Sequence, residues 1–498
     1  MDRIELPRPS DDQDETRDHQ NQCLVLLDQL PDAIILHIFS FLTTTESIKT
    51  SVLSKRWRST WTSNPYITFS LPVDKRPKRN SKNFIHFTEA FIDTVLSFWT
   101  TIKVKRLLFD VPFHASMQSS IDRLLQFAVR HNFEELSMTL SSGRSSSWPL
   151  TVYVLPHFLF RCTTLVSFRV ICCCFLMIGA VNWSSLKILR IEFADFDDDA
   201  MIRLLSGSPV LESLELKFCQ GFKHIRVESR ALKELVIDSH GTRSLILEIW
   251  APYLLKLRLV GNSVGAGFKV HEASSLVEAD LNFDLTYALD AFGRVRAHGD
   301  LVKGLLQRLH HVTKLVMGSW CLQVLSLMDT RELRLPSLEC RHPTFLIAAD
   351  HKGVPGLAKI LESSPCLEKL FLQLTCKHSS SWSLQNLGRP NFDAEEFWNS
   401  PKRRIYRRLT HVKVVDPGAN LLAWEPALSM LKFLLQNTPS LDEIAINSAN
   451  SNPSKAIHPW VLLKVARIIL SHARCSPSAK VILKYPSQGC PSKRARKS

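Results

Sequence analysis

The chain has 498 residues, a net charge of +15 and an aliphatic-rich composition, which is enough for about three domains or for one elongated repeat array. Its 12 cysteines are scattered without paired spacing and without a secretory signal, so we expect reduced thiols and not a disulfide framework. The longest apolar run, 170–181, is shorter than the roughly 20 residues that cross a bilayer, so no membrane span is predicted.

The first structured module begins at about residue 26, after a tail (1–25) that we expect to be disordered. Leu30-Pro31 predicts a helix start, because proline lacks the N–H that would find no acceptor in the first turn. The residues that follow form two apolar stripes at helical spacing, one of Ile34, Ile38 and Phe41 and one of Ile35, Phe39 and Leu42. Together they are wider than the roughly 100° stripe of a surface helix, so one stripe is left for a partner.

The second half of this module is predicted to be a further helical segment. The threonine run 43–45 predicts a break, with Thr44 or Thr45 as the N-cap of the next helix. Three apolar residues then repeat every four positions on one helix face: Leu53, Trp57 and Trp61. A module of about forty residues is near the lower size limit for an independent core. A large apolar surplus on such a module indicates a protein interface.

The run Val52-Leu53-Ser54-Lys55-Arg56-Trp57, together with the Leu-Pro start, resembles the F-box motif over residues 26–70. F-boxes bind the Skp adaptor of cullin-RING ubiquitin ligases, so the resemblance implies a Skp-family adaptor and, through it, a cullin as partners. By position in the motif, the expected adaptor-contact residues are Leu30, Pro31, Ile35, Ile38, Leu42, Leu53 and Trp57. Leu53 and Trp61 also fit the module's own core, whereas Pro31 and Trp57 are expected at the interface.

Much of the excess positive charge is concentrated in three segments: the linker 71–83, the stretch 402–408 and the tail 487–498. Two of them resemble short nuclear-import signals, and we expect a nuclear or cytoplasmic location. Solvated linker charge is the preferred explanation, since neither interleaved aromatic residues nor zinc-ligand spacing accompanies the clusters. Direct binding of nucleic acid is therefore not favoured.

The centre of the chain, 84–403, repeats the pattern L-x-x-L-x-L with conservative apolar replacements. Six copies start at residues 165, 186, 211, 232, 254 and 276, with spacings of 21, 25, 21, 22 and 22. These spacings fall within the roughly 20–29 residues of leucine-rich repeats. Weaker copies start at 104, 133, 312 and 367, and a partial copy lies at Leu333-Leu335. In each copy the L-x-L portion predicts a short strand with alternate residues buried.

This pattern resembles the leucine-rich-repeat solenoids, and the Ser/Pro-rich lead-ins at 206–209 and 362–365 resemble those joined to plant F-boxes. The expected fold class is α/β: a small helical F-box followed by a solenoid with parallel strands on one face and helices on the other. Each repeat has an apolar side that it buries only by stacking on its neighbours. Irregular inserts are expected near 284–310 and 377–403, either as functional loops or as disordered segments.

Residues between the motif leucines should point outward from the strands, where they can contact other molecules. In register, they are Arg169, Arg190, Glu192, Glu215, Lys217, Glu234, Asp238, Lys256, Arg258, Asp280 and Asn282. Their mixed signs favour a protein target or a polar ligand over a uniform polyanion. For any single residue of this row, we prefer the interpretation that it is a solvated surface residue. For the face as a whole, we prefer the interpretation that it contacts the target.

Residues 404–486 alternate between strand and helix signals and resemble the FBD region that follows the repeats of plant F-box proteins. The expected elements are strands at 409–414, 441–446 and 481–483 and helices at 428–435 and 460–470. The segment 416–426 departs from the usual strand exit of that family. A cap that closes the end of the solenoid is the preferred role.

The sequence contains no phosphate-binding loop, nucleophile elbow, zinc-protease motif or paired C-x-x-C. Enzyme activity, a cofactor and a metal site are therefore not predicted. Cys172-Cys173-Cys174 would alternate between faces of a strand and cannot all reach one ion. Asp197-Asp198-Asp199 is explained by a loop or a helix start.

These features predict a non-catalytic substrate-recognition subunit of a Skp-cullin-F-box ubiquitin ligase, with the adaptor on the F-box and an unknown protein target on the repeats. Two alternatives are a receptor for a small ligand, such as an inositol phosphate or hormone, and a scaffold that uses the F-box for assembly alone. No cluster of Lys and Arg on successive strands supports the ligand receptor.

Overall fold

The computed structural model describes residues 29–70, 82–100, 103–140, 152–176, 179–238, 245–261, 268–283, 293–328, 335–348, 351–375, 393–398, 406–416, 424–448, 459–472 and 474–484. The chain divides into two compact units, the first made of 1–196 with 203–211 and the second of 197–202 with 212–498. Our predictions for the tails and for linker residues 71–81 lie outside the described residues.

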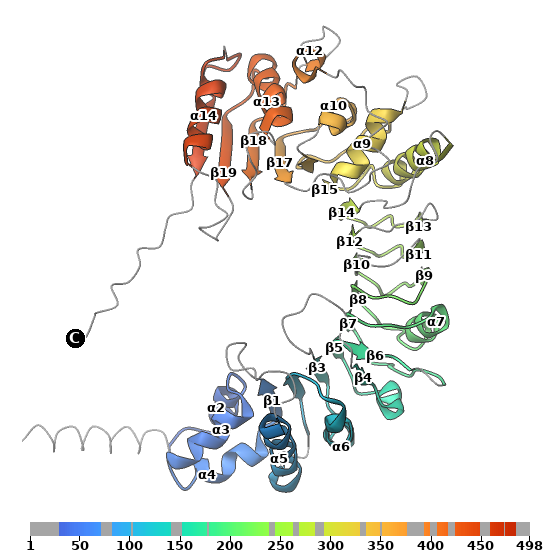
Figure 1. Ribbon diagram of the computed structural model, residues 1–498, viewed down its shortest axis with the longest axis vertical. Coiled ribbons are helices and arrows are strands. Elements are labelled where there is room, and N and C mark those ends of the chain that lie inside the picture. The colour runs from blue at the N-terminus through green and yellow to red at the C-terminus, as the bar shows by residue number, and fades with distance from the viewer. Residues whose placement is uncertain are drawn as a thin grey trace, which may run out of the picture. The chain divides into compact units, whose positions relative to one another are not determined.

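The first unit opens with a small helical module, as predicted (Figure 1). Its elements are α2 (Asp32–Phe39), α3 (Thr44–Lys49), the 3-10 turns η1 (Thr50–Val52) and η2 (Trp61–Ser63), and α4 (Trp57–Thr60). Thr43, and neither Thr44 nor Thr45, is the N-cap of α3. Its hydroxyl accepts a hydrogen bond from the Glu46 N–H, and Glu46 accepts one from the Thr43 N–H, which completes a capping box.

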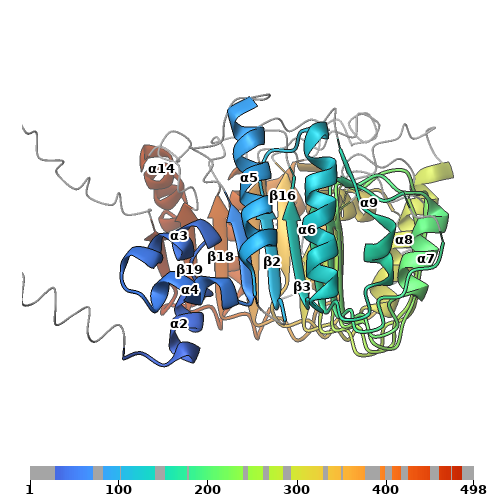
Figure 2. The same cartoon turned by 90° about the horizontal axis from the view of Figure 1, so that it is seen from below.

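Parallel strands follow in the first unit, in the order β1 (Tyr66–Ser70), β2 (Arg106–Asp110), β3 (Glu135–Thr139), β5 (Ser167–Ile171) and β7 (Ile188–Glu192). Figure 2 shows α5 (Lys82–Phe98) and α6 (Gln118–Arg130) next to one another beside these strands. The remaining elements are η4 (Ala115–Met117), η5 (His157–Arg161) and the pair β4 (Tyr153–Val154) and β6 (Cys173–Cys174). The segment that we assigned to the F-box therefore already contains the first strand of the sheet.

The second unit continues the same architecture with a parallel sheet. Its strands, in order, are β8 (Ser213–Lys217), β10 (Glu234–Asp238), β12 (Lys256–Gly261), β14 (Glu278–Phe283), β15 (Lys314–Met317), β16 (Thr344–Ala348), β17 (Lys369–Thr375), β18 (His411–Asp416), β19 (Glu443–Ser448) and β20 (Lys480–Lys484). Its helical elements are α8 (Gly293–Arg308), α9 (Ser319–Leu327), η6 (His351–Gly353), α10 (Val354–Glu362), α12 (Ala394–Trp398), α13 (Glu425–Asn437) and α14 (Pro459–Leu470), whereas α7 (Asp198–Ser206) has residues in both units.

The repeat prediction is confirmed by register and burial. Phe168 lies opposite Leu189, Val170 lies opposite Ile191, and Leu235 lies between Leu214 and Leu257. All the motif residues of the six main copies are buried, because adjacent strands within each unit bring equivalent apolar side chains into contact.

Three details of the predicted solenoid are wrong. The second face is not helical throughout, since β9 (His224–Glu228), β11 (Ile246–Trp250) and β13 (Lys269–Glu272) form a parallel sheet of their own behind β8 to β14 (Figure 1). These repeats have the short spacing of 21 or 22 residues, which leaves room for two turns and a strand, whereas longer repeats hold helices. The predicted insert 284–310 is described from residue 293 onward, and that part forms the regular helix α8.

The third detail concerns the partial repeat at Leu333-Leu335, of which Leu333 lies outside the described residues. Residues 335–340 have no regular structure, and the strand of this repeat is β16, which has no preceding L-x-x-L signal. The predicted insert 377–403 is described only at 393–398, where Trp398 is buried against Phe433 of α13 with ring centroids 5.3 Å apart. The five expected elements of the C-terminal region are present as β18, α13, β19, α14 and β20.

Candidate protein-interaction surfaces

The core of the helical module is formed by one of the two apolar stripes of α2. Ile35 and Phe39 are fully buried, and the ring of Phe39 meets the edge of Trp57 at a centroid distance of 5.6 Å. Only 2% of Trp57 is exposed. Ile35 and Trp57, which we expected at the adaptor contact, are therefore core residues of the module, because the face of α2 that carries Ile35 packs toward α4.

The other stripe of α2 is at the surface. We call Ile34, Ile38 and Phe41 the α2 stripe; Ile34 is exposed, Ile38 is half-buried, and Phe41 is 76% exposed with its ring against His37 at 5.0 Å. The surface also includes Pro31, and Leu30, Leu42 and Leu53 are half-buried. Five of the seven predicted contact residues are thus accessible: Leu30, Pro31, Ile38, Leu42 and Leu53.

Three exposed apolar residues were missing from the predicted contact set. Ile34 and Phe41 belong to the stripe that we noted but were not assigned to the contact, and Val52 is 87% exposed at the end of η1. The signal for Val52 was its place in the recognised motif directly before Leu53. Exposed apolar side chains on a small folded module are typical of a protein-binding surface.

The helical module is joined to the first strands by specific contacts. The Thr68 N–H on β1 donates to the Thr44 hydroxyl at 2.9 Å, and Arg106 on β2 donates to the Ser40 carbonyl at 2.9 Å. Trp61 packs against Trp99 with ring centroids 5.8 Å apart. Because both hydrogen bonds join the module to neighbouring strands, its orientation on these strands is fixed.

The candidate target-binding residues lie at outward positions of β5 and β7 in the first unit and of β8 to β14 in the second. All eleven predicted residues alternate with buried residues and are themselves half-buried or exposed. Glu278, at the start of β14, is a further member that we missed. Its Cα partners are Lys256 and Lys314, so the position of Lys256 in the predicted row was the available signal.

Many charges on this face pair with one another. Arg169 lies 3.4 Å from Glu192, and Lys217 pairs with Glu215. Arg258 lies 3.1 Å from Asp280. Such pairs contribute little stability at a surface, about 0.2–1 kcal/mol each, but they neutralise the face. Their mixed signs argue against a polyanion or an inositol phosphate as the ligand of these strands.

Two neighbouring carboxyl groups on β14 have opposite pKa shifts. A hydrogen bond from Lys314 lowers the pKa of Glu278, and the charges of Lys256 and Lys314 act in the same direction. Burial raises the pKa of Asp280, and Arg258 only partly opposes that effect. The Nζ of Lys314 lies 2.5 Å from the Glu278 carboxylate, and the Nζ of Lys256 lies 3.7 Å from it.

We expect the charge on Glu278 to make a small, pH-dependent contribution to stability. Because its folded pKa is depressed, the contribution is present above the ordinary Glu pKa and is lost as the pH falls through the folded value. Glu278→Gln should therefore lower the free energy of unfolding near pH 7 by up to about 0.5 kcal/mol, after allowance for solvent screening, and by less at pH 3. Urea unfolding at both pH values measures the difference.

The control for Glu278→Gln is the same substitution in a Lys314→Met chain. Lys314 is the largest cause of the pKa shift, so the pH-dependent difference should be smaller without it. An equal difference in both backgrounds would contradict the assignment.

The outward face continues beyond Asn282 with a more apolar set that we did not predict. Val316, Thr344 and Phe371 are Cα partners on β15, β16 and β17, and all three are half-buried. The weak repeats at 312 and 367 place Val316 and Phe371 outward, but Thr344 has no such signal. An apolar centre beside paired charges is the usual composition of a protein-binding surface.

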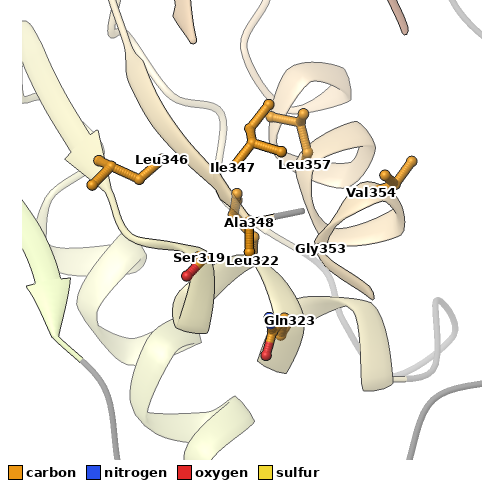
Figure 3. Close-up of a pocket in the computed structure, with 9 residues that line it drawn as sticks. All are labelled: Ser319, Leu322, Gln323, Leu346, Ile347, Ala348, Gly353, Val354 and Leu357. Carbon is orange, nitrogen blue, oxygen red and sulfur yellow. The ribbon is translucent and has the colours of Figure 1, made fainter. Parts of the chain in front are cut away.

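A small pocket lies behind β16, between α9 and α10 (Figure 3). It is lined by Ser319, Leu322, Gln323, Leu346, Ile347, Ala348, Gly353, Val354 and Leu357. Its free volume of about 10 Å³ has room for one water molecule. This pocket therefore does not accommodate a hormone-sized ligand.

The cysteine and aspartate runs have structural roles. Burial raises the pKa of Cys172 to about 11 and that of Cys173 well above its ordinary value, which favours the unreactive thiol. Asp197 accepts a hydrogen bond from the Ala200 N–H at the start of α7, and Asp198 accepts two from the N–H groups of Lys223 and His224. In the described ranges, no three His, Cys, Asp or Glu residues are grouped to hold a metal ion.

Within the same part of the chain, none of the helices combines the length and apolar character needed to cross a membrane.

A helical module followed by stacked strand repeats defines a leucine-rich-repeat protein with an N-terminal F-box. The F-box domain model matches residues 27–68, and a model described as FBD-associated F-box protein At5g56370, LRR repeats, matches 121–279. The chain is 30% identical over 435 residues to the F-box/LRR-repeat protein At5g02910 of Arabidopsis thaliana, covering 84% of this chain and 87% of the relative. It belongs to the plant F-box/LRR-repeat family.

Two further Arabidopsis thaliana relatives are similar over comparable lengths. The putative F-box/LRR-repeat protein At5g02930 is 27% identical over 84% of this chain and 86% of its own length. The FBD-associated F-box protein At1g66310 is 25% identical over 86% of this chain and 91% of its own length. The predicted F-box, repeats and family are thereby confirmed, and the FBD association extends to a relative that aligns with most of the chain.

Proposed function

We propose that this protein is the substrate-recognition subunit of a Skp-cullin-F-box ubiquitin ligase. The observation that carries the proposal is the α2 stripe, which stays exposed although the F-box has a complete core of its own around Phe39 and Trp57. A Skp-family adaptor would cover the stripe together with Pro31 and Val52, and the adaptor would connect the chain to a cullin. The proposal implies a nuclear or cytoplasmic location.

The target protein would bind the outward face of the strands. The apolar set of Val316, Thr344 and Phe371 offers a site for buried anchor residues, and paired charges such as Arg258–Asp280 supply directional contacts. The chain would act by proximity: it holds a target lysine near the conjugating enzyme and raises its effective concentration. No catalytic group of this chain takes part in the transfer.

The adaptor contact is tested by Phe41→Ala in the full chain. Because Phe41 is highly exposed, its removal should leave the thermal unfolding midpoint unchanged, yet weaken binding of a purified Skp-family adaptor by at least about tenfold, the effect of a buried aromatic anchor. Calorimetric titration measures the dissociation constant.

Phe98→Ala is the matched control, since Phe98 is also an exposed phenylalanine but lies at the end of α5. Its adaptor affinity should equal that of the unmodified chain. Full affinity of Phe41→Ala, or equal losses in both variants, would refute the assignment of the α2 stripe to the adaptor. A scaffold without ligase function would bind the adaptor normally but would not promote ubiquitination of the proteins held on its strand face.

A further inference from the structure

The last strand of the second unit leaves part of its apolar side uncovered. Val481 and Leu483 on β20 are the Cα partners of Ile444 and Ile446 on β19. Both isoleucines are fully buried, whereas Val481 is half-buried and Leu483 is 37% exposed. Within the described residues β20 is the terminal strand of this sheet and pairs only with β19. Among the described residues, the repeat core therefore reaches the surface at β20, and one edge of that strand pairs with no other strand.

Helix α14 lies beside this end of the sheet (Figure 1) and exposes further apolar side chains. Val465 and Ile469 are fully buried on its inner side. Its outer side carries the exposed residues Trp460, Leu463 and Leu470, and 64% of Leu463 is exposed. An ordinary surface helix would present polar residues at these positions.

The charge around these apolar residues is mostly positive. Residues 444–498 contain ten Lys or Arg and no Asp or Glu. Lys464 and Arg467 are exposed on α14, and Lys480 and Lys484 are exposed on β20. On the neighbouring strand, Glu443 is the Cα partner of Lys480, and Asp442 precedes it. Lys484 has the neutral Asn447 as its partner.

We propose that α14 and β20 form a second protein-docking surface, which binds an acidic, amphipathic segment of a partner protein. The apolar side chains of the segment would pack on Leu463 and Leu483. Its carboxylates, which alternate with them along a strand, would meet Lys484, and Lys464 and Arg467 would add to the positive charge around the site. Its backbone would pair with the edge of β20, as in other complexes formed by strand addition. This surface is separate from the α2 stripe and does not depend on the adaptor proposal.

A protein segment fits this surface better than the other polyanions. A strand edge presents backbone N–H and C=O groups, which a peptide can satisfy and a lipid surface cannot. Among the exposed apolar residues of this surface, Leu463, Leu470 and Leu483 are aliphatic and Trp460 is aromatic. One ring does not provide the successive stacking platforms on which a single-stranded nucleic acid binds. The residues that follow β20 have no acidic side chain that could neutralise Lys464 and Arg467.

The experiment uses the full chain and a synthetic peptide that alternates glutamate with valine. The peptide carries a fluorophore, and anisotropy reports its binding. We expect saturable binding that weakens as the salt concentration rises, and amide exchange that slows in 480–484. A lysine-for-glutamate peptide should bind at least about tenfold more weakly, because it repels the basic surface.

Two matched variants place the binding site. Leu463→Glu should weaken binding of the acidic peptide by at least about tenfold, whereas Leu176→Glu, at an exposed leucine of the first unit, should not change it. Phe41→Ala should leave it unchanged as well, which separates this test from that of the adaptor contact. The proposal would be overturned by absent peptide binding, by equal affinity for both peptides, by equal losses in the two leucine variants, or by binding only to phosphatidylserine-containing vesicles.

Discussion

Trp57→Ala is expected to destabilise the F-box by about 3–5 kcal/mol, as do other substitutions that remove a buried aromatic side chain. Trp57 is 2% exposed and contacts Phe39, and these two rings form much of a core made of very short helices. Such a small module has little stability in reserve. We therefore expect the F-box to unfold at a temperature at which the repeats remain folded.

Amide exchange followed by mass spectrometry measures this local unfolding. In Trp57→Ala, the amides of α2 and α3 should exchange rapidly, while those of β8 to β14 keep their protection. Adaptor binding should be lost together with the fold, in contrast to Phe41→Ala, which should lose binding and keep its protected amides. If the Trp57→Ala module were folded but bound the adaptor weakly, Trp57 would be an interface residue, as we predicted from the sequence.

Of the substitutions proposed for the second unit, Gly356→Ala is expected to lower the free energy of unfolding most. The loss should lie at the upper end of the range of about 1–3 kcal/mol that overpacking costs, or beyond it. Gly356 lies in α10, where an added Cβ would be 1.9 Å from the Leu322 carbonyl oxygen and 3.0 Å from the Ser326 backbone nitrogen of α9. Both obstacles are backbone atoms, so the two helices would have to separate. The hydrogen bond from the Gly356 N–H to the Ser326 hydroxyl, 2.8 Å long, would be strained at the same time.

Gly304→Ala is the control for this prediction. Gly304 also lies in a helix, α8, but an added Cβ would meet no atom within 4 Å. Alanine should therefore raise the stability, by up to about 1 kcal/mol, because it favours the helical backbone. Denaturant unfolding of both variants tests the contrast. Similar effects of the two substitutions would show that α9 and α10 are not in close contact at Gly356.

The strand positions could be predicted because their signal is local and repeated. Each L-x-x-L-x-L copy specifies its own buried residues, and a neighbouring copy in register supplies the contact, as for Leu235 between Leu214 and Leu257. The outward positions follow from the same alternation, which is why the eleven predicted face residues lie where expected. The prediction became less reliable where the repeat spacing changed. Strand β16 was missed because its buried residues, Phe345 and Ile347, lack the first leucine of the pattern, which would stand three residues before Phe345.

The F-box shows what an amphipathic pattern leaves open. Two apolar stripes on α2 indicate that one packs inward and the other outward, but not which one. The choice depends on the approach of α4, whose Trp57 meets Phe39 and not Phe41. Likewise, the pairing of Lys256 and Lys314 with Glu278 requires the strand register, since these residues are far apart in sequence. Tertiary geometry decides both questions.

The attachment of the F-box to β1 and β2 has a consequence for the choice of modified lysines. Thr44 and Ser40 hold the module to β1 and β2 through direct hydrogen bonds, so the part of a target that is seated on strands of the first unit, such as β5 and β7, would not turn freely about the adaptor. Under the proposed function, ubiquitin would be transferred only to those target lysines whose distance and direction from these strands bring them to the conjugating enzyme. Two targets that bind equally well could then differ in the rate of their modification, through the position of their lysines alone.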